Sequence, residues 1–88
     1  MSISELKGLG PKSAASLATI NIRTVEKFMA TDAFQMYALL KTVSPETSLN
    51  MLYAMIGAQE GIHWKEVALT RKVEILMRLD DMNLAPKR

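Results

Sequence analysis

The stretch that decides the fold is Gly8-Leu9-Gly10-Pro11-Lys12-Ser13, close to the start of the 88-residue chain. Glycine adopts positive φ at little steric cost, so two glycines separated by one residue allow the chain to reverse direction sharply. A proline suits the first turn of a helix, where its missing N–H would have no partner within the helix. The stretch therefore predicts a helix-hairpin-helix motif, with helices over about 3–7 and about 11–19.

Helix start and stop signals continue along the chain and predict a compact all-α domain of five to six helices. Thr24 and Thr31 are suitable N-cap residues, because a threonine hydroxyl can accept a hydrogen bond from the first helical turn. Gly61 is expected to end a helix in the left-handed conformation. The further helices are expected to begin near residues 25, 32, 47 and 68. Residues 62–67 are expected to form a short connector, and residues 82–88 a frayed tail.

The last expected helix, over about 68–81, carries two apolar stripes. The stripe expected to face the core consists of Leu69, Val73, Leu76 and Met77. The second stripe consists of Ile75, Leu79 and Met82. The chain also contains seven methionines, which either fill gaps in a small core or give an adaptable apolar surface to a partner or a second copy. A homodimer is therefore one of the interpretations that the sequence leaves open.

Length and composition limit the class of protein. A chain of 88 residues is expected to form one domain, over 1–88, with a core but without a deep active-site cleft. The absence of cysteine excludes disulfides and thiolate metal sites. No apolar run approaches the ~18 residues of a membrane helix, and the first residues do not resemble a signal peptide. We therefore expect a soluble, cytoplasmic protein with no membrane partner.

No set of catalytic groups can be assembled from these residues, so we expect no enzyme and no cofactor. His63 is the only histidine, and no carboxylate pair is placed to complete a metal site around it. A structural or surface role is therefore expected for His63. Trp64 is expected to fill the core between the last two helices, with its indole N–H bonded to backbone, and stacking on a nucleic-acid base is the alternative.

The hairpin carries the candidate binding site. Backbone N–H groups at the start of a helix form an anion site, which the helix dipole strengthens. Lys12 can add a charge-assisted contact to phosphate, and Ser13 a hydroxyl hydrogen bond. The residues expected to contact the DNA backbone are Lys7, Gly8, Leu9, Gly10, Lys12 and Ser13. One such hairpin should bind double-stranded DNA weakly and without sequence preference, with a Kd of roughly 10⁻⁴ to 10⁻⁶ M. The alternative is that the turn only packs two helices together.

The order and spacing of four motifs resemble those of the C-terminal domain of the TfoX (Sxy-type) regulators of bacterial DNA uptake and competence. The motifs are Leu6-Lys7-Gly8-Leu9-Gly10-Pro11-Lys12-Ser13, Ile22-Arg23-Thr24-Val25-Glu26, Ser48-Leu49-Asn50-Met51-Leu52-Tyr53-Ala54-Met55-Ile56-Gly57-Ala58 and His63-Trp64-Lys65-Glu66-Val67. The resemblance covers nearly the whole chain, and its last two motifs are the distinguishing ones. Relatives often have a proline where this chain has Ala68.

The resemblance implies a fold in the helix-hairpin-helix (SAM-like) superfamily and a positive role in the regulation of competence genes. That role would use contact with promoter DNA, with another transcription regulator or with RNA polymerase. Family members often carry a further domain before this one, so the chain is expected to be either a stand-alone relative or one piece of a longer regulator. The alternative function is a protein-interaction or dimerisation module that contacts the transcription machinery without binding DNA itself.

Overall fold

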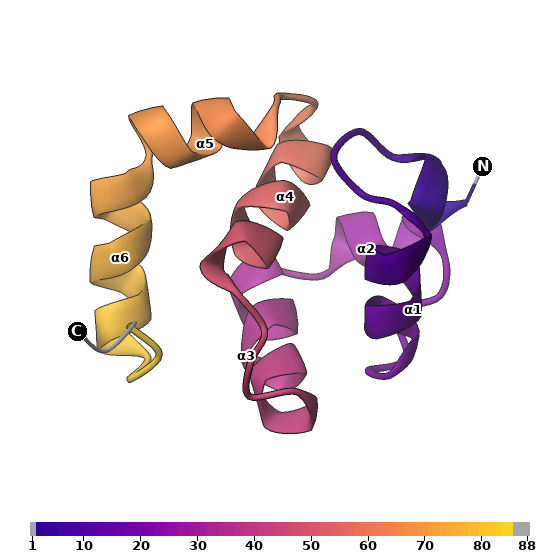
Figure 1. Ribbon diagram of the computed structural model, residues 1–88, viewed down its shortest axis with the longest axis horizontal. Coiled ribbons are helices and arrows are strands. Elements are labelled where there is room, and N and C mark those ends of the chain that lie inside the picture. The colour runs from indigo at the N-terminus through magenta and orange to yellow at the C-terminus, as the bar shows by residue number, and fades with distance from the viewer. Residues whose placement is uncertain (1, 86–88) are drawn as a thin grey trace.

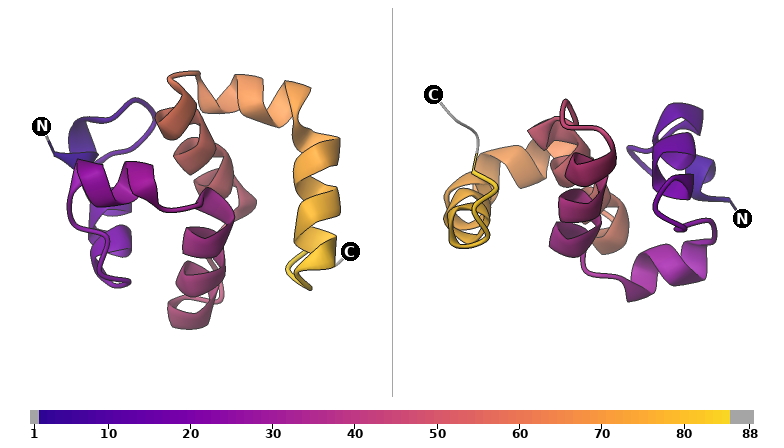
Figure 2. Two further views of the ribbon diagram at one scale, coloured as in Figure 1. Left: turned by 180° about the vertical axis from the view of Figure 1, so that it is seen from behind. Right: turned by 90° about the horizontal axis from the view of Figure 1, so that it is seen from below.

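The computed structural model describes residues 2–85, and within this range the chain forms six α-helices, one 3-10 turn and no strand (Figure 1). The elements are η1 (Ile3–Glu5), α1 (Pro11–Ala18), α2 (Val25–Ala30), α3 (Ala33–Val43), α4 (Leu49–Glu60), α5 (Trp64–Thr70) and α6 (Lys72–Asp81). Helices α3 and α4 lie at the centre, the hairpin with α1 and α2 on one side of them, and α6 on the other (Figure 2). The all-α prediction is confirmed.

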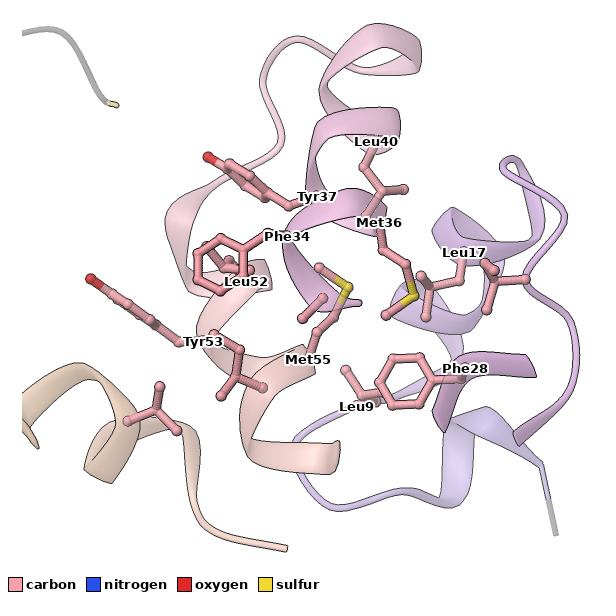
Figure 3. Packing of buried hydrophobic residues seen from close by; sticks show 14 of the residues in the cluster. Leu9, Leu17, Phe28, Phe34, Met36, Tyr37, Leu40, Leu52, Tyr53 and Met55 are labelled. Atoms are coloured by element: carbon pink, nitrogen blue, oxygen red, sulfur yellow. The ribbon is translucent and has the colours of Figure 1, made fainter. Parts of the chain in front are cut away.

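The buried apolar residues form one cluster, to which every α-helix contributes. Met36 of α3 and Met55 of α4 point toward each other and toward Leu17 and Phe28, and all four side chains are fully buried (Figure 3). Two of the methionines therefore fill the centre of the core, where an unbranched side chain adapts to irregular space. Met77, by contrast, is 65% exposed, so gap-filling does not account for it, and an adaptable surface for a partner or a second copy stays a prediction.

The first helices follow the sequence signals with small shifts. The Thr24 hydroxyl accepts a hydrogen bond from the Lys27 N–H at 3.1 Å, so the predicted cap of α2 is confirmed. The start of α3 was predicted one residue too early, because Asp32 and not Thr31 is its N-cap. A charged carboxylate is the stronger acceptor at the positive end of a helix, and the hydroxyl of Thr31 donates instead to the Lys27 carbonyl at 2.6 Å.

The first predicted helix is shorter than the sequence suggested, since a single 3-10 turn over Ile3–Glu5 replaces a helix over 3–7. Leu6 is already extended, at φ −71° and ψ 145°, because the chain must straighten before it enters the hairpin. The helix predicted from residue 47 begins at Leu49, after Ser48 as the N-cap. These differences lie at element ends, where alternative hydrogen bonds differ little in free energy.

The largest differences from the sequence prediction lie over residues 62–81. The predicted connector is helical from Trp64, and the predicted last helix is broken at Arg71, where φ is −126° and ψ is 11°. The inward stripe was also assigned wrongly, because Leu69, Val73 and Met77 are exposed, whereas Ile75 and Leu79 of the second stripe are fully buried. Periodicity locates two stripes on a helix but does not record which of them meets the rest of the core.

Three helices end in the same way, with a left-handed residue followed by an apolar one. The left-handed residues are Asn21 (φ 66°), Gly61 (φ 73°) and Asn83 (φ 60°). The following residue donates its N–H back to the helix, as Ile22 to Leu17, Ile62 to Gly57 and Leu84 to Leu79, at 3.0, 2.9 and 2.8 Å. This geometry satisfies carbonyls that the helix end would leave free. The prediction for Gly61 is confirmed, whereas the two asparagine ends were not predicted.

The segment after α6 packs back on the domain over its described part. Met82, Leu84 and Ala85 are partly buried against the core. Of the predicted frayed tail over 82–88, the structure therefore shows packed residues at 82–85, and residues 86–88 lie outside the described range. No helix of the described chain has the length and apolar character to cross a bilayer.

Candidate nucleic-acid interface

The hairpin turn is shaped by Gly8 and anchored by Leu9. Gly8 has a φ of +84°, which side-chain-bearing residues rarely adopt. Leu9 is only 7% exposed and its N–H donates to the Leu6 carbonyl at 3.0 Å, so this residue holds the turn on the core rather than facing solvent. Gly10 is extended, at φ −135°, and is the N-cap of α1. The predicted site thus contains one buried anchor, Leu9, while Lys7, Gly8 and Lys12 are exposed and Gly10 and Ser13 are half-buried.

The start of α1 is left without a side-chain cap. Gly10 has no side chain to accept a hydrogen bond, and Pro11 occupies the first helical position. The first-turn N–H groups of Lys12 and Ser13 therefore face away from any carbonyl of their own helix. Uncapped N–H groups at the positive end of a helix favour an anion. This is the geometry that the sequence predicted for the hairpin.

The lysines around the turn are available for an outside partner. Lys7 and Lys12 are exposed, and neither takes part in an ion pair among the described residues. The arginines of the C-terminal half are used inside the domain instead. Arg71 pairs with Glu60 and Glu74, and the hydrogen bond with Glu60 raises the pKa of the Arg71 guanidinium above its usual value.

A groove of about 550 Å³ runs beside the hairpin, between α1 and α4. Three of the six predicted site residues, Gly8, Lys12 and Ser13, lie along it, whereas Lys7, Leu9 and Gly10 do not. The other lining residues come from α1, the α3–α4 region, α4 and α5, and are Ser16, Leu40, Ser44, Glu46, Thr47, Ser48, Asn50, Met51, Ala54 and Trp64. Hydroxyl and amide groups therefore face the lysine side of the hairpin. Glu46 is the acidic residue of the lining, so the Lys12 side of the groove is the better place for a phosphate.

Sequence reasoning missed the part of this surface that α4 and α5 supply. Its location depends on Gly57, which is buried in α4. A Cβ at Gly57 would lie 2.6 Å from the Ile62 carbonyl oxygen and 3.3 Å from the Trp64 nitrogen. The chain after α4 can therefore fold back tightly, and this places Trp64 in the groove. The signal was present in the Gly57-Ala58 and His63-Trp64 motifs, but their spacing alone did not reveal the close approach.

His63 and Trp64 stabilise the start of α5 and its packing on the core, although His63 is exposed and Trp64 is only partly buried. The His63 Nδ1 accepts a hydrogen bond from the Lys65 N–H at 3.1 Å and so caps α5. Its ring stacks on that of Trp64, with centroids 5.9 Å apart, and the Lys65 ammonium lies 5.8 Å from the indole centroid. Trp64 is partly buried against the core, as expected, but no partner for its indole N–H occurs within residues 2–85. Those residues also contain no cluster of three potential metal ligands.

The fold defines the chain, as a class, as a small all-α domain, with an uncapped helix start and unpaired lysines beside a polar groove over the described residues. The family model described as the TfoX C-terminal domain matches residues 1–79, and the chain belongs to this family. The resemblance seen in the sequence is thereby confirmed. The family places the chain among competence-regulator-like domains, which are regulatory and not known as enzymes.

A solved structure shares the fold. The crystal structure of an uncharacterized protein from Listeria monocytogenes, in a triclinic form, is similar with a TM-score of 0.82 and 19% sequence identity. The similarity covers 99% of this chain and 100% of the other chain. A search of curated proteins found no match. At this level of identity, the likeness establishes the arrangement of the helices alone.

Proposed function

We propose that residues 1–88 form one regulatory, non-enzymatic domain that contacts the backbone of double-stranded DNA through the hairpin end. The observation that carries the proposal is the uncapped start of α1, with the ammonium groups of Lys7 and Lys12 free beside it. A duplex offers a row of phosphates, which such a surface can contact without reading bases. A regulator of competence genes would meet this DNA in the cytoplasm.

The expected affinity is low, because the surface is small. Two to four phosphates within reach would give a salt dependence of about −0.9 per phosphate in log K against log salt, and a Kd of roughly 10⁻⁴ to 10⁻⁶ M. Selection of a promoter would then require a further element, such as a second DNA-contacting copy, another regulator or RNA polymerase. The hairpin supplies attachment, and the partner supplies specificity.

The experiment that tests this proposal compares two lysines at opposite sides of the domain. Lys12→Ala removes one charge at the hairpin, and Lys72→Ala removes one charge from α6, across α3 and α4 (Figure 1). Binding of a labelled duplex would be measured at several salt concentrations, with the protein titrated from about 1 µM to about 1 mM so that the range includes the expected Kd. We expect Lys12→Ala to weaken binding several-fold and to reduce the salt slope by about 1, whereas Lys72→Ala leaves both unchanged. Equal effects of the two substitutions would contradict a hairpin site.

The second candidate function is protein interaction without DNA contact, and a specific observation favours it. Leu69, Val73 and Met77 are exposed on α5 and α6, away from the hairpin. Under this function the hairpin only packs helices together, and the apolar surface meets a component of the transcription machinery. A protein that binds RNA polymerase in a pull-down with purified components, and shows no salt-dependent binding to any duplex, would establish this candidate over the first.

A further inference from the structure

The groove beside the hairpin reaches deeper than a contact with phosphates requires. Its volume of about 550 Å³ lies within the range of small-molecule sites, about 300–1,000 Å³. Its wall from α4 is one helical stripe, since Asn50 and Met51 stand four and three residues before Ala54. Leu40 also lines the groove and is only 2% exposed, so the groove extends down to the apolar core. A duplex, whose phosphates lie on its outside, would leave this floor uncovered.

Several polar groups along the groove have no partner inside the domain. The Ser13 hydroxyl, the Asn50 amide and the Trp64 indole N–H form no hydrogen bond within residues 2–85. They are open to solvent, because no buried side-chain nitrogen or oxygen of the described residues lacks a partner. An apolar floor with a few free donors and acceptors beside it is the usual composition of a ligand site.

The hairpin and Trp64 approach the same helix at positions close together. A Cβ added to Gly8 would lie 4.0 Å from the Ala54 carbonyl oxygen. A Cβ added to Gly57 would lie 3.3 Å from the Trp64 nitrogen. Ala54 and Gly57 are three residues apart, which is about 4.5 Å along a helix. Successive phosphates of one DNA strand are about 3.4 Å apart along the duplex axis, so the hairpin and Trp64 are separated by the length of about one nucleotide.

The charges around the groove place a phosphate at its hairpin side. Within the described part of the chain, Lys12 is the cation of the lining and Glu46 is the anion. Glu46 precedes α4, whereas Trp64 lies against the end of this helix. Lys65 and Glu66, which follow Trp64, are both exposed and offset each other. The positive charge that can hold a phosphate is therefore that of Lys12.

We propose that the groove accepts the base of one unpaired nucleotide of a DNA strand, with a phosphate of the same strand at Lys12. The base lies on Met51, since a thioether makes favourable contacts with an aromatic ring. Its edge meets the Asn50 amide and the indole N–H of Trp64, whose ring already stacks on His63. A paired base cannot enter in this way, because the opposite strand uses its edge. The proposal rests on the proposed function for the phosphate contact and adds a preference for DNA with unpaired nucleotides.

The first test compares three DNA probes that carry the same number of phosphates. One is a blunt duplex, the second has an unpaired thymidine overhang, and the third has an overhang of abasic nucleotides. The thymidine overhang is expected to bind about fivefold more tightly than the abasic one, and this ratio should not change with salt, because thymine carries no charge. Trp64 is the single tryptophan of the chain, so its fluorescence should also be quenched more by the thymidine overhang. Equal binding of the two overhangs, or equal quenching at saturation, would overturn the proposal.

The second test places a carboxylate in the groove without changing the fold. Asn50→Asp is nearly isosteric, and a carboxylate in the first turn of α4 suits the positive end of the helix. Gln35→Glu is the matched control, because it makes the same amide-to-carboxylate change in the first turn of α3, at an exposed residue outside the groove lining. Asn50→Asp is expected to reduce the preference for the thymidine overhang to less than about twofold, whereas Gln35→Glu preserves it. Circular dichroism checks that both variants fold, and equal ratios in the two variants would refute the groove site.

The outcomes separate this proposal from the proposed function. If the two overhangs bind equally and Lys12→Ala still weakens binding of the blunt duplex, the hairpin site stands and the groove proposal fails. If Lys12→Ala leaves the binding of all three probes unchanged, the proposed function fails, and the groove proposal fails with it because its phosphate contact is lost.

Discussion

The hairpin end and the α5–α6 end of this domain differ in which side chains they bury and which they expose. At the hairpin, the large apolar residue Leu9 is buried and the charged residues Lys7 and Lys12 are exposed without partners. At the other end, Leu69 is exposed while Arg71 is held by ion pairs within the domain. The hairpin end thus buries its large apolar residue below exposed charges, whereas the α5–α6 end exposes apolar side chains beside Lys72, which is unpaired among the described residues. The two ends therefore differ in where their large apolar side chains lie.

The largest difference in stability between the two ends is expected when one leucine at each end is truncated to alanine. Leu9→Ala should lower the free energy of unfolding by about 2–4 kcal/mol, because it removes a buried side chain and leaves a cavity under the hairpin. Leu69→Ala should change it by less than about 0.5 kcal/mol, because that side chain is 84% exposed. Urea unfolding followed by circular dichroism would measure both. Similar losses in the free energy of unfolding for the two variants would contradict the difference in burial between Leu9 and Leu69.

Two glycines provide the next largest contrast. Gly57→Ala should destabilise the domain by about 1–3 kcal/mol, since the added Cβ meets the backbone oxygen of Ile62 and the turn into α5 must shift. Gly10→Ala should cost only about 0.5 kcal/mol or less, because nothing lies within 4 Å of a Cβ there and its φ is negative. Chemical denaturation of both variants measures the difference. A neutral Gly57→Ala would mean that α4 and α5 do not approach as closely as described.

A smaller effect is expected for the arginine that ties α6 to the start of α3. Arg78 donates to the Asp32 carboxylate at 3.2 Å and lies 4.2 Å from the Phe34 ring centroid. Its side chain is 55% exposed, so Arg78→Ala should cost only about 0.5–1 kcal/mol, and less at high salt. Lys12→Ala has no such contact to lose and should leave the stability unchanged. Thermal unfolding at low and high salt would separate the two, and salt-independent losses would argue against the Arg78 contacts.

The smallest expected effect belongs to the tyrosines between the two ends. Burial raises the pKa of Tyr37 above its usual value of 10.0, with a further contribution from Tyr53, and burial also raises the pKa of Tyr53. A phenol that ionises more readily in the unfolded chain destabilises the fold as the pH rises, so stability should fall above about pH 10 and be unaffected below it. Tyr37→Phe should make this fall shallower. An unchanged pH profile between about 9 and 11 would contradict the cause given for the shift.

The hairpin end could be predicted from the sequence because its signals are local. Gly8, Gly10 and Pro11 act within their own turn, and the cap of α2 needs only Thr24 and the N–H three residues later. Local hydrogen bonding also explains the one-residue error at Asp32, where two adjacent residues could both cap α3. The prediction of the site on the hairpin likewise used only residues that are neighbours in the sequence.

The rest could not be predicted because it depends on contacts between distant residues. The Gln59 side chain donates to the carbonyls of Phe28 and Thr31, at 2.9 and 2.8 Å, and so fixes α4 against the end of α2. Arg71, at the break in the expected last helix, pairs with Glu60 at the end of α4, on the other side of α5 in the sequence. Such packing also decides which apolar stripe of α6 faces the core, and the periodicity of the sequence alone does not determine this orientation. The groove wall from α4 and α5 was missed for the same reason.

The most direct test of DNA contact by the hairpin end is a titration of the isotope-labelled chain with a short duplex at low salt, followed by amide NMR. One spectrum contains amide signals from both the hairpin end and the α5–α6 end. A binding site at the hairpin predicts shifts concentrated at residues 7–13 and at the groove residues Asn50 and Trp64, with residues 69–77 unchanged at a fixed low protein concentration. Adding salt should reverse the shifts. Shifts confined to α5 and α6, or none near Lys12 at saturating duplex, would contradict the claim that the hairpin end contacts DNA.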